Sequence, residues 1–384
     1  MDADVIVVGL GSMGSQALWR LARRGVRAIG FDRFRPPHAL GSHHGGSRII
    51  RTAYYEAPDY VPLAGRSFEL WRELEAESGT DLLTMTRGLH IGPPDSPEFA
   101  GALSSSQQHG LEHEVLDRDA MLRRFPQHLL ADDDRALLER EAGFVRPEAC
   151  IAAALQRAAS LGAQVHLDAQ VTTVEASSGG VMVHASGKRW NARRAIVAAG
   201  AWNSALGVPG MDLPLRVVRQ SQAWFRAVRP ELHHPTLAPV FVRNIGRREQ
   251  PGPEFAYGFP SIDGETVKVG VAEDHGTVDP DTVDRRPLPA DSTAVSAFVQ
   301  RTMPGLDPEP VRVAVCLQEF SSDHHFIVGP LPAAPAIVAL MGFSGHGFKF
   351  ASAIGEAAAG FAVDGGTDLP VAHLAAGRFL GVRS

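Results

Sequence analysis

Three glycines near the start of the chain have the spacing that binds a dinucleotide. Gly9, Gly11 and Gly14 form the pattern G-x-G-x-x-G. In this pattern the first glycine permits a tight turn, the second lets a pyrophosphate approach the backbone, and the third lets a helix pack against a strand. Asp32 follows at the distance where an acidic side chain accepts a hydrogen bond from a ribose hydroxyl. These residues indicate binding of FAD or NAD, and they disfavour NADP with its 2′-phosphate.

The residues around these glycines predict the elements that hold them. Residues 5–8 are an unbroken β-branched run, which is typical of a strand buried in a parallel sheet. Residues 15–24 have apolar side chains at helical spacing, so we expect a helix whose N-terminal N–H groups face the glycine turn. Residues 27–31 predict a second strand, which ends at Asp32. A glycine turn without a nucleotide is the alternative, and this context disfavours it.

Three cationic side chains could bind an anion beside such a cofactor. Arg48 and Arg51 lie at the end of a Pro/Gly/His-rich loop and would be neighbours if this turn were helical. They predict a cationic clamp, and a pair of exposed arginines is the alternative of equal weight. Lys349 falls in the first turn of a helix that we expect to begin after the glycine-rich segment 342–347. A cation there opposes the helix dipole, which predicts that it faces an anion.

Composition excludes several classes of protein. The 384 residues carry a formal net charge of −6 without a basic block, so no nucleic-acid partner is expected. No apolar run approaches the roughly 20 residues that span a membrane, and the first strand leaves no room for a cleaved signal, so we expect a cytoplasmic protein. Cys150 and Cys316 are far apart and lack metal-binding spacing, so we expect neither a disulfide nor a metal site.

The rest of the chain alternates between two kinds of pattern. Residues 194–204 read as a buried strand that ends in small residues, which is typical of the way flavoproteins close an FAD site against bare backbone at a residue such as Gly200. Short strands with turns between them then predict a mostly antiparallel sheet. We expect helices at 60–78, 98–109, 118–125, 148–160, 289–302 and 351–361, and strands at 87–92, 165–175, 180–185, 194–204, 217–227, 240–243, 255–259, 266–271, 311–318 and 336–341.

These patterns predict an α/β protein with two domains. The first is a discontinuous Rossmann-type FAD-binding domain, and the second is a substrate or catalytic domain with a mostly antiparallel sheet. The FAD-binding domain comprises residues 1–81, 143–214 and 316–384, and the substrate domain comprises residues 82–142 and 215–315.

Three stretches carry a more specific resemblance. They are residues 37–51, the strand 315–316 followed by Asp323-His-His-Phe-Ile, and the segment 342–350. With them the chain resembles, over essentially its full length, the monomeric sarcosine oxidase and N-methyltryptophan oxidase family within the D-amino-acid-oxidase-like group. The resemblance implies a monomeric FAD enzyme that oxidises a secondary or primary amine of an amino-acid-like substrate to an imine and reduces oxygen to hydrogen peroxide. A flavin dehydrogenase or tailoring enzyme for a cyclic or carrier-bound amine, a nicotinamide dehydrogenase, and a flavoprotein without catalysis are the alternatives.

The resemblance also implies roles for single residues. It implies a thioether from Cys316 to the flavin; without it this cysteine reads as buried core. Arg48 is implied near the flavin ring, and Arg51 with Lys349 on the substrate carboxylate. Lys268 matches the lysine that activates oxygen, where a fixed cation stabilises developing superoxide.

The pocket around the substrate differs from the family pattern. Tyr257 matches the tyrosine of the pocket roof, which with Arg48 and Lys268 completes the implied catalytic set. Ala272 stands where the family has a histidine, with Glu273, Asp274 and His275 following, and Gln318 stands where it has an aromatic residue. The reaction class is therefore implied more strongly than sarcosine as substrate. The implied FAD contacts are Gly9, Gly11, Ser12, Met13, Gly14, Asp32, Arg33, Ser42, His43, His44, Arg48, Val171, Gly200, Trp202, Cys316, Gly342, Gly345, His346, Gly347, Phe348 and Lys349.

Overall fold

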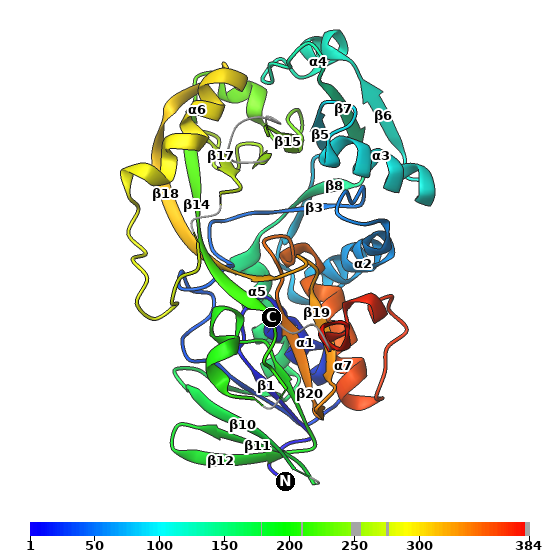
Figure 1. Ribbon diagram of the computed structural model, residues 1–384, viewed down its shortest axis with the longest axis vertical. Helices are drawn as coiled ribbons and strands as arrows, with labels where there is room; N and C mark the ends of the chain where they lie inside the picture. The colour runs from blue at the N-terminus through cyan, green and yellow to red at the C-terminus, as the bar shows by residue number, and fades with distance from the viewer. Residues whose placement is uncertain (178, 209, 247–254, 274–275, 381–384) are drawn as a thin grey trace.

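A six-stranded sheet forms one end of the molecule in the computed structural model, which describes residues 1–177, 179–208, 210–246, 255–273 and 276–380 (Figure 1). Its strand order is β19-β20-β13-β1-β2-β9, and all neighbours are parallel except the pair β19 and β20. Its buried β-branched strands match the pattern of a sheet that is covered on both faces. Its strands are β1 (Val5–Val8), β2 (Ala28–Phe31), β9 (Gln164–His166), β13 (Arg194–Val197), β19 (Ile327–Leu331) and β20 (Ala334–Met341).

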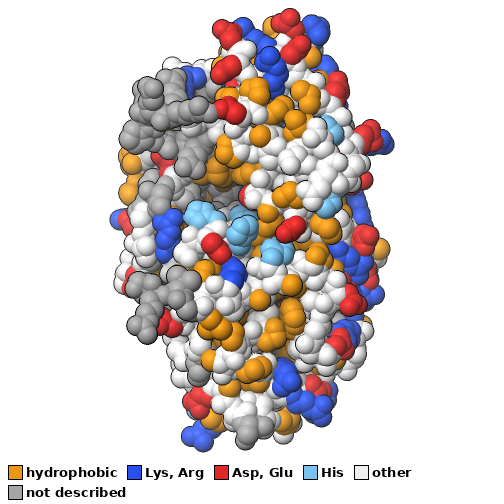
Figure 2. Space-filling view, turned by 45° about the vertical axis from the view of Figure 1, so that its right-hand side comes forward, with side chains coloured by type: hydrophobic (Ala, Val, Ile, Leu, Met, Phe, Trp, Pro, Cys, Tyr) orange, Lys and Arg blue, Asp and Glu red, His pale blue; other side chains and the backbone are white. Residues whose placement is uncertain are grey.

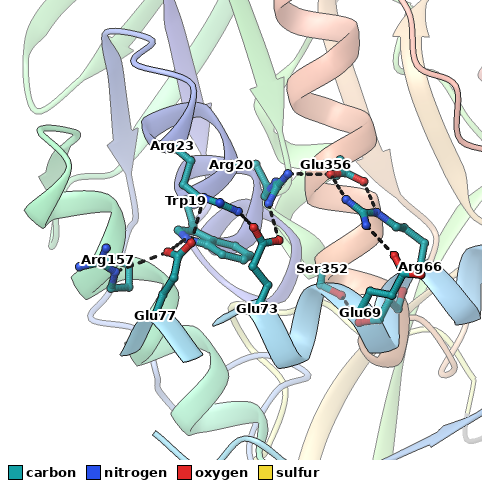
Figure 3. Close-up of polar contacts among 11 residues, drawn as sticks. Trp19, Arg20, Arg23, Arg66, Glu69, Glu73, Glu77, Arg157, Ser352 and Glu356 are labelled. Carbon is teal, nitrogen blue, oxygen red and sulfur yellow. Dashed lines mark hydrogen bonds and ion pairs between the residues drawn. The ribbon is translucent and has the colours of Figure 1, made fainter. Parts of the chain in front are cut away.

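Four helices pack together on this sheet: α1 (Ser12–Arg23), α2 (Val61–Ser78), α5 (Pro147–Ser160) and α7 (Ala351–Val363). Their polar faces are joined by an ion-pair network, in which Arg20 contacts Glu73 at 3.0 Å and Glu356 at 2.6 Å, and Arg66 contacts Glu356 at 2.7 Å (Figure 3). Because these side chains are partly exposed, each pair stabilises the fold only modestly. Together they tie α1 to α2 and α7, which fixes the helix whose N-terminus faces the glycine turn.

An eight-stranded sheet forms the other end of the molecule (Figure 1). Its order is β18-β14-β17-β16-β15-β5-β7-β6, and only β15 and β5 pair in parallel. Helix α6 (Thr293–Thr302) packs on it through Phe298, beside Phe225 and Phe241. The strands are β5 (Gly88–Gly92), β6 (His113–Leu116), β7 (Arg135–Glu139), β14 (Leu215–Ala227), β15 (Val240–Asn244), β16 (Phe255–Gly258), β17 (Thr266–Val271) and β18 (Leu306–Ser321), with α3 (Pro97–His109) and α4 (Arg118–Arg124) nearby.

Two small sheets complete the fold. The meander of β10 (Val171–Ser177), β11 (Gly180–Ala185) and β12 (Lys188–Ala192) lies at the end of the molecule that holds the six-stranded sheet. The sheet of β3 (Arg48–Arg51), β8 (Ala142–Val145) and β4 (Leu83–Met85) lies between the two large sheets (Figure 1). This central sheet therefore carries both predicted arginines at the junction of the two halves.

The predicted α/β class, with a mostly antiparallel second sheet, is confirmed. The strand predicted at 165–175 is wrong in detail, because Asp168 takes a φ of 54° and the chain leaves β9 before it starts β10. The strand predicted at 194–204 ends at Val197, since Gly200 with a φ of 57° begins a 3-10 helix, η2 (Gly200–Leu206). The helix predicted at 289–302 begins with a 3-10 turn before α6.

The division into two domains stays a prediction. The strands of the eight-stranded sheet come from residues 88–139 and 215–321, and those of the six-stranded sheet come from the other segments. The predicted boundary at 315/316 falls inside β18, which pairs with β14 on both sides of it. Among the described residues, no helix is long and apolar enough to cross a membrane.

Candidate active site

The glycine turn opens into a cavity of 320 Å³ that reaches from Asp32 to Gln318. The third glycine is required by packing, because a Cβ on Gly14 would lie 1.8 Å from the carbonyl oxygen of Gly9. Asp32 accepts hydrogen bonds from the backbone N–H of Leu10 at 2.7 Å and of Phe34 at 2.8 Å. Burial raises the pKa of Asp32, and these two bonds oppose that rise. The acid is thus fixed at the end of β2, as the dinucleotide pattern requires.

A loop after β17 covers the same end of the cavity. The carboxylate of Asp281 accepts from Arg33 Nη1 at 2.7 Å and from Trp202 Nε1 at 2.9 Å, and all three residues line the cavity. No sequence motif marks Asp281 as a site residue. Through these contacts the loop that follows β17 forms part of the cavity wall.

The cavity fits an extended dinucleotide. Glycines without side chains line the cavity where such a ligand must approach the backbone. The N-terminus of α1, which has no side-chain cap, faces the cavity. Fifteen of the predicted FAD contacts line the cavity: Gly9, Gly11, Ser12, Met13, Asp32, Arg33, Ser42, His43, Arg48, Val171, Gly200, Trp202, Gly345, Gly347 and Phe348. The others lie behind this lining or beside it: Gly14, His44, Cys316, Gly342, His346 and Lys349.

Glu319 is a cavity-lining residue that sequence reasoning missed. It lies on β18, and its carboxylate accepts from Asn203 Nδ2 at 2.9 and 3.1 Å and from the N–H of Gly342 at 2.8 Å. Burial raises the pKa of Glu319 to about 7, although both hydrogen bonds oppose this. A buried carboxyl group with a raised pKa therefore lies against the predicted cofactor site.

Arg48 lies in a strand, which corrects the expectation of a helical turn. Residues three apart in a strand point to opposite faces of the sheet, so Arg48 and Arg51 do not form one clamp. Arg48 lines the cavity and donates to the carbonyl oxygens of Ser42, His44 and Ser47 at 2.6, 2.6 and 2.7 Å. The loop wrapped around its guanidinium places a fixed positive charge beside the cofactor site.

Cys316 is buried on β18, where Gln222 Nε2 donates to its sulfur at 3.5 Å. The neighbouring His44 donates from Nε2 to the carbonyl oxygen of Val315 at 2.8 Å. The thiol also acts electrostatically on Tyr257, whose pKa burial and this group raise to about 12. The cysteine is thus placed beside the predicted catalytic residues, one position before the cavity-lining Leu317.

Arg51 is buried and already holds a carboxylate. Its Nη2 donates to both oxygens of Glu56 at 2.8 and 2.7 Å, and its Nη1 donates to the carbonyl oxygen of Ala53 at 2.9 Å. The aromatic rings of Tyr54 and Tyr55 lie 4.3 and 4.4 Å from the guanidinium carbon. Burial alone would raise the pKa of Glu56, but Arg51 and nearby cations lower it to about 2. Sequence reasoning found Arg51 and missed Glu56.

Lys349 lies close to this pair. Its Nζ donates to the carbonyl oxygen of His346 at 2.7 Å, and burial together with the charge of Arg51 lowers the pKa of Lys349 to about 7. The imidazole of His346 bonds the hydroxyl of Tyr54, and its Nε2 donates to the carbonyl oxygen of His324 at 3.1 Å. Glu56 and Glu139 both act on Lys349 through charge, and the predicted contact of Lys349 with a bound anion stays a prediction.

The buried residues Glu139 and His90 support the backbone that follows Arg51. One oxygen of Glu139 accepts from the N–H of Thr52 at 3.0 Å and of Ala53 at 2.8 Å, and the other accepts from His90 Nε2 at 2.8 Å. The peptide of Ala53 is therefore held by Glu139 on its N–H group and by Arg51 on its own carbonyl. This arrangement keeps Arg51 in place independently of Glu56.

Lys268 lies on β17 and is buried. Its Nζ donates to the carbonyl oxygens of Gly45 at 3.0 Å and Ser47 at 2.6 Å, and it lies 4.1 Å from the ring centre of Phe259. Burial and the charge of Arg48 lower the pKa of Lys268. The loop that surrounds Arg48 thus also binds this second cation.

The predicted pocket residues Tyr257 and Ala272 lie outside the lining of the cavity. Gln318 lines the cavity, and Tyr257 packs so closely against β17 that a Cβ on Gly270 would lie 2.5 Å from its hydroxyl. Ala272 is half-buried, and its N–H donates to the carbonyl oxygen of Phe255 at 2.9 Å. The side chain of Gln220 reaches the carbonyl oxygen of Glu273, while Asp274 and His275 lie outside the described residues.

The cavity reaches the surface at Gly345, which is exposed. Histidines lie close by, since His346 contacts His324, and Tyr60 contacts His325 at 3.0 Å. Figure 2 shows histidine side chains grouped beside a hollow in the middle of one face, with hydrophobic side chains above it. Within the described part of the chain, no group of three or more His, Cys, Asp or Glu residues could hold a metal ion.

The chain belongs to the FAD dependent oxidoreductase family, whose model matches residues 4–360. It is 38% identical over 377 residues to a monomeric sarcosine oxidase of Streptomyces avermitilis, covering 96% of this chain and 95% of that protein. It is 34% identical over 367 residues to an N-methyl-L-tryptophan oxidase of Salmonella arizonae, covering 95% of each. The expected resemblance is thereby confirmed, and the chain is an FAD-dependent amine oxidoreductase.

Solved structures agree with this assignment. NikD, described as an unusual amino acid oxidase essential for nikkomycin biosynthesis, matches with a TM-score of 0.86 at 25% identity and covers 97% of both chains. Glycine oxidase from Geobacillus kaustophilus matches with a TM-score of 0.82 at 20% identity over 99% of both chains, which concerns the fold alone.

Proposed function

We propose that this enzyme oxidises the amine of an amino-acid-like carboxylate to an imine, with oxygen as the electron acceptor and hydrogen peroxide as the product. The observation that carries the proposal is the pair of buried cations, Arg51 and Lys349, together with the carboxylate of Glu56, which accepts two hydrogen bonds from Arg51. Lys349 directly follows Phe348, which lines the FAD cavity. A substrate carboxylate that takes the place of Glu56 would be oriented by an Arg fork next to the cofactor.

The bound FAD supplies the two-electron oxidation chemistry. The chain would hold it with the glycine turn, Asp32, Arg48 and the segment 342–348. Arg51 and Lys349 would bind and orient the substrate, while Tyr257 and Gln318 shape the space for its amine and side chain. Lys268 would place a fixed cation where oxygen becomes negatively charged.

An amine panel tests this function. Purified holoenzyme is mixed anaerobically with amino acids, N-methyl amino acids and cyclic amino acids, and the loss of flavin absorbance at each amine is followed. Aerobic turnover is then expected to give one hydrogen peroxide for each amine oxidised. The absence of bleaching with every carboxylated amine, combined with no peroxide, would contradict the proposal.

We also propose that FAD is attached covalently through Cys316. A lone buried thiol beside cationic side chains could form the thioether as thiolate. It would replace one hydrogen of the flavin 8α-methyl group, which leaves as a proton, and the two electrons would pass through the flavin to oxygen and give hydrogen peroxide. Acid denaturation and intact mass measurement are expected to show a protein heavier by one FAD. Cys316→Ser should release all of its flavin into the supernatant, whereas the buried helix residue Cys150, changed to Ser, should keep the adduct. Retention of the adduct in Cys316→Ser would rule out this attachment site.

The charge of Lys349 predicts a pH dependence of substrate binding. Because its pKa is lowered to about 7, the free enzyme loses this positive charge as the pH rises through 7. Binding of a simple carboxylic acid without an amine, read from the flavin spectrum, is therefore expected to weaken by up to about tenfold per pH unit above 7. The Lys349→Met variant should bind the carboxylic acid weakly at every pH, and its affinity should no longer depend on pH. An unchanged slope in Lys349→Met would assign the titration to another group.

A second function is favoured by the altered pocket. Ala272 and Gln318 remove an imidazole and an aromatic ring from the family pattern, which leaves room for a larger or cyclic amine. In a dehydrogenase or tailoring enzyme on this scaffold, such an amine would bleach the flavin, but little oxygen would be consumed. Measurement with an oxygen electrode therefore distinguishes this function from that of an oxidase. The implied monomeric state and cytoplasmic location also stay proposals.

A further inference from the structure

The side chain of Glu319 joins the two large sheets at the FAD cavity. Glu319 lies on β18, and its carboxylate accepts from Asn203 Nδ2 at 2.9 and 3.1 Å and from the N–H of Gly342 at 2.8 Å. Asn203 Oδ1 in turn accepts from the N–H of Ala199 at 2.8 Å. Ala199 follows β13, and Gly342 follows β20, which is the parallel neighbour of β13. Glu319 is therefore held where the ends of two strands of the six-stranded sheet meet β18.

This carboxyl group lies at the half of the cavity that would hold the flavin. Asp32 is placed where the ribose of the adenosine binds, and the cavity reaches from there to Gln318. In FAD the adenosine and the flavin ring lie on opposite sides of the pyrophosphate, so the flavin half is expected toward Gln318. Glu319 is the next residue along β18, lines the cavity and is buried. A change of charge on the flavin would therefore act on this carboxyl group at a low local dielectric constant.

The described contacts of Glu319 include no charged group. Its hydrogen-bond donors are an amide and a backbone N–H, and burial raises its pKa to about 7 against the effect of both. The charged or titratable side chains on the elements packed against this part of β18 are Arg216 and Arg219 on β14, Asp291, which pairs with Arg219, and His346 and Lys349 in the segment after β20. Those in the cavity wall are Asp32, Arg33, His38, His43, Arg48 and Asp281. None of these groups is among the described partners that would fix the charge of Glu319.

We propose that Glu319 takes up a proton from solvent when the bound FAD receives two electrons, and returns it to solvent when those electrons leave. When the C–H bond of the amine breaks, its two electrons and one proton pass to the cofactor, which gains one negative charge, and the amine becomes an iminium cation. The proton on Glu319 compensates the charge of the cofactor.

The direction of this coupling follows from the environment of Glu319. Burial already raises the pKa of the carboxyl group to about 7, and an added negative charge in the same cavity raises it further. Above about pH 7 the ionised carboxylate is therefore expected to become protonated as FAD is reduced. The inference rests on FAD binding and requires no particular amine or electron acceptor.

The midpoint potential of the bound FAD, measured against pH with an electrode and mediator dyes, tests this proposal. Each proton taken up with two electrons changes the equilibrium constant for reduction tenfold per pH unit, which corresponds to about 30 mV. The potential of the parent is expected to fall by about 60 mV per pH unit between about pH 7 and 9, because the cofactor and Glu319 each take up one proton.

Glu319→Gln removes the titrating group and keeps an oxygen that can accept from Gly342. Its potential should fall by only about 30 mV per pH unit, and it should approach the parental value at about pH 6, where the parental carboxyl group is protonated in both redox states. Glu309→Gln is the matched control, because it makes the same change at an exposed position of β18 that does not line the cavity. This control should keep the parental slope.

Infrared difference spectra of the parent give a second test that needs no variant. Reduction at about pH 8 is expected to produce the C=O band of a protonated carboxyl group, which Glu309→Gln should keep and Glu319→Gln should lack. Equal slopes of potential against pH in the parent and in Glu319→Gln, or absence of the band in the parent, would overturn the proposal. Neither measurement uses an amine or oxygen. Failure of every amine to bleach the flavin would instead contradict the proposed amine oxidation, so the two failures are distinguishable.

Discussion

Lys268→Met is expected to slow the reaction of the reduced enzyme with oxygen by about 10²- to 10³-fold and to leave reduction by the amine nearly unchanged. Nζ is buried and donates to two carbonyl oxygens, so this nitrogen is held in one place before oxygen arrives. Methionine keeps a similar length and removes the charge. A charge fixed in a water-poor site stabilises developing superoxide far more than a mobile charge in solvent does.

Stopped-flow measurement of the two half-reactions checks this prediction. Lys188→Met is the matched control, because Lys188 is exposed on β12 and does not line the FAD cavity. The parent and Lys188→Met should show the same two rate constants. Equal slowing of reduction and reoxidation in Lys268→Met would indicate a distorted site rather than a lost charge, and would contradict the role assigned to Lys268.

The dinucleotide site was readable because its parts are close in sequence. Gly9, Gly11, Gly14 and Asp32 span a strand, a helix and a strand, and their spacing alone fixes their relation. The helix and the second strand lie within a few residues of the predicted positions, since the apolar periodicity there is local.

The sequence did not predict that Arg48 and Arg51 point to opposite faces, because this depends on pairing with a strand far away in the sequence. Their segment becomes a strand by pairing with residues 142–145, so that Arg48 lies opposite Val145 and Arg51 opposite Ala142. A four-residue strand in a polar loop leaves no periodicity in the sequence. The tertiary contact overrode the local pattern and turned the two side chains to opposite faces.

The carboxylates of the site were missed for a similar reason. No sequence motif marks Glu56, Glu139 or Glu319, and acidic residues are rarely buried. Burial is decided by the packing of both halves of the molecule, and the two resolved shifts go in opposite directions, with the pKa of Glu56 at about 2 and that of Glu319 at about 7. Arg51, and to a smaller degree His346 and Lys349, lower the pKa of Glu56, whereas the described contacts of Glu319 include no cation.

Arg51→Met is expected to lower kcat/KM for the carboxylated amine by about 10²- to 10⁴-fold, mainly through a higher KM. Truncating one member of a buried charge pair costs about 2–5 kcal/mol, and the substrate carboxylate would lose both donors of the fork. Arg51→Lys should recover only part of the loss, since an ammonium cannot form the bidentate contact. Glu56→Gln should act in the other direction and lower KM, because the neutral amide competes less well for Arg51 than the native carboxylate does.

A substrate without the carboxylate distinguishes a loss of carboxylate binding in Arg51→Met from a distortion of the active site. The parent should oxidise the corresponding decarboxylated amine slowly, and Arg51→Met should oxidise it at the same slow rate, because that substrate never uses the fork. Thermal unfolding of each variant, followed by flavin release, identifies any loss that comes from leaving Glu56 buried without its cation. If Arg51→Met loses activity equally toward both amines, Arg51 maintains the loop at 52–56 and the carboxylate is recognised elsewhere. A loss confined to the carboxylated amine, with the opposite change in Glu56→Gln, would instead locate the substrate carboxylate at the position that Glu56 fills in the free enzyme.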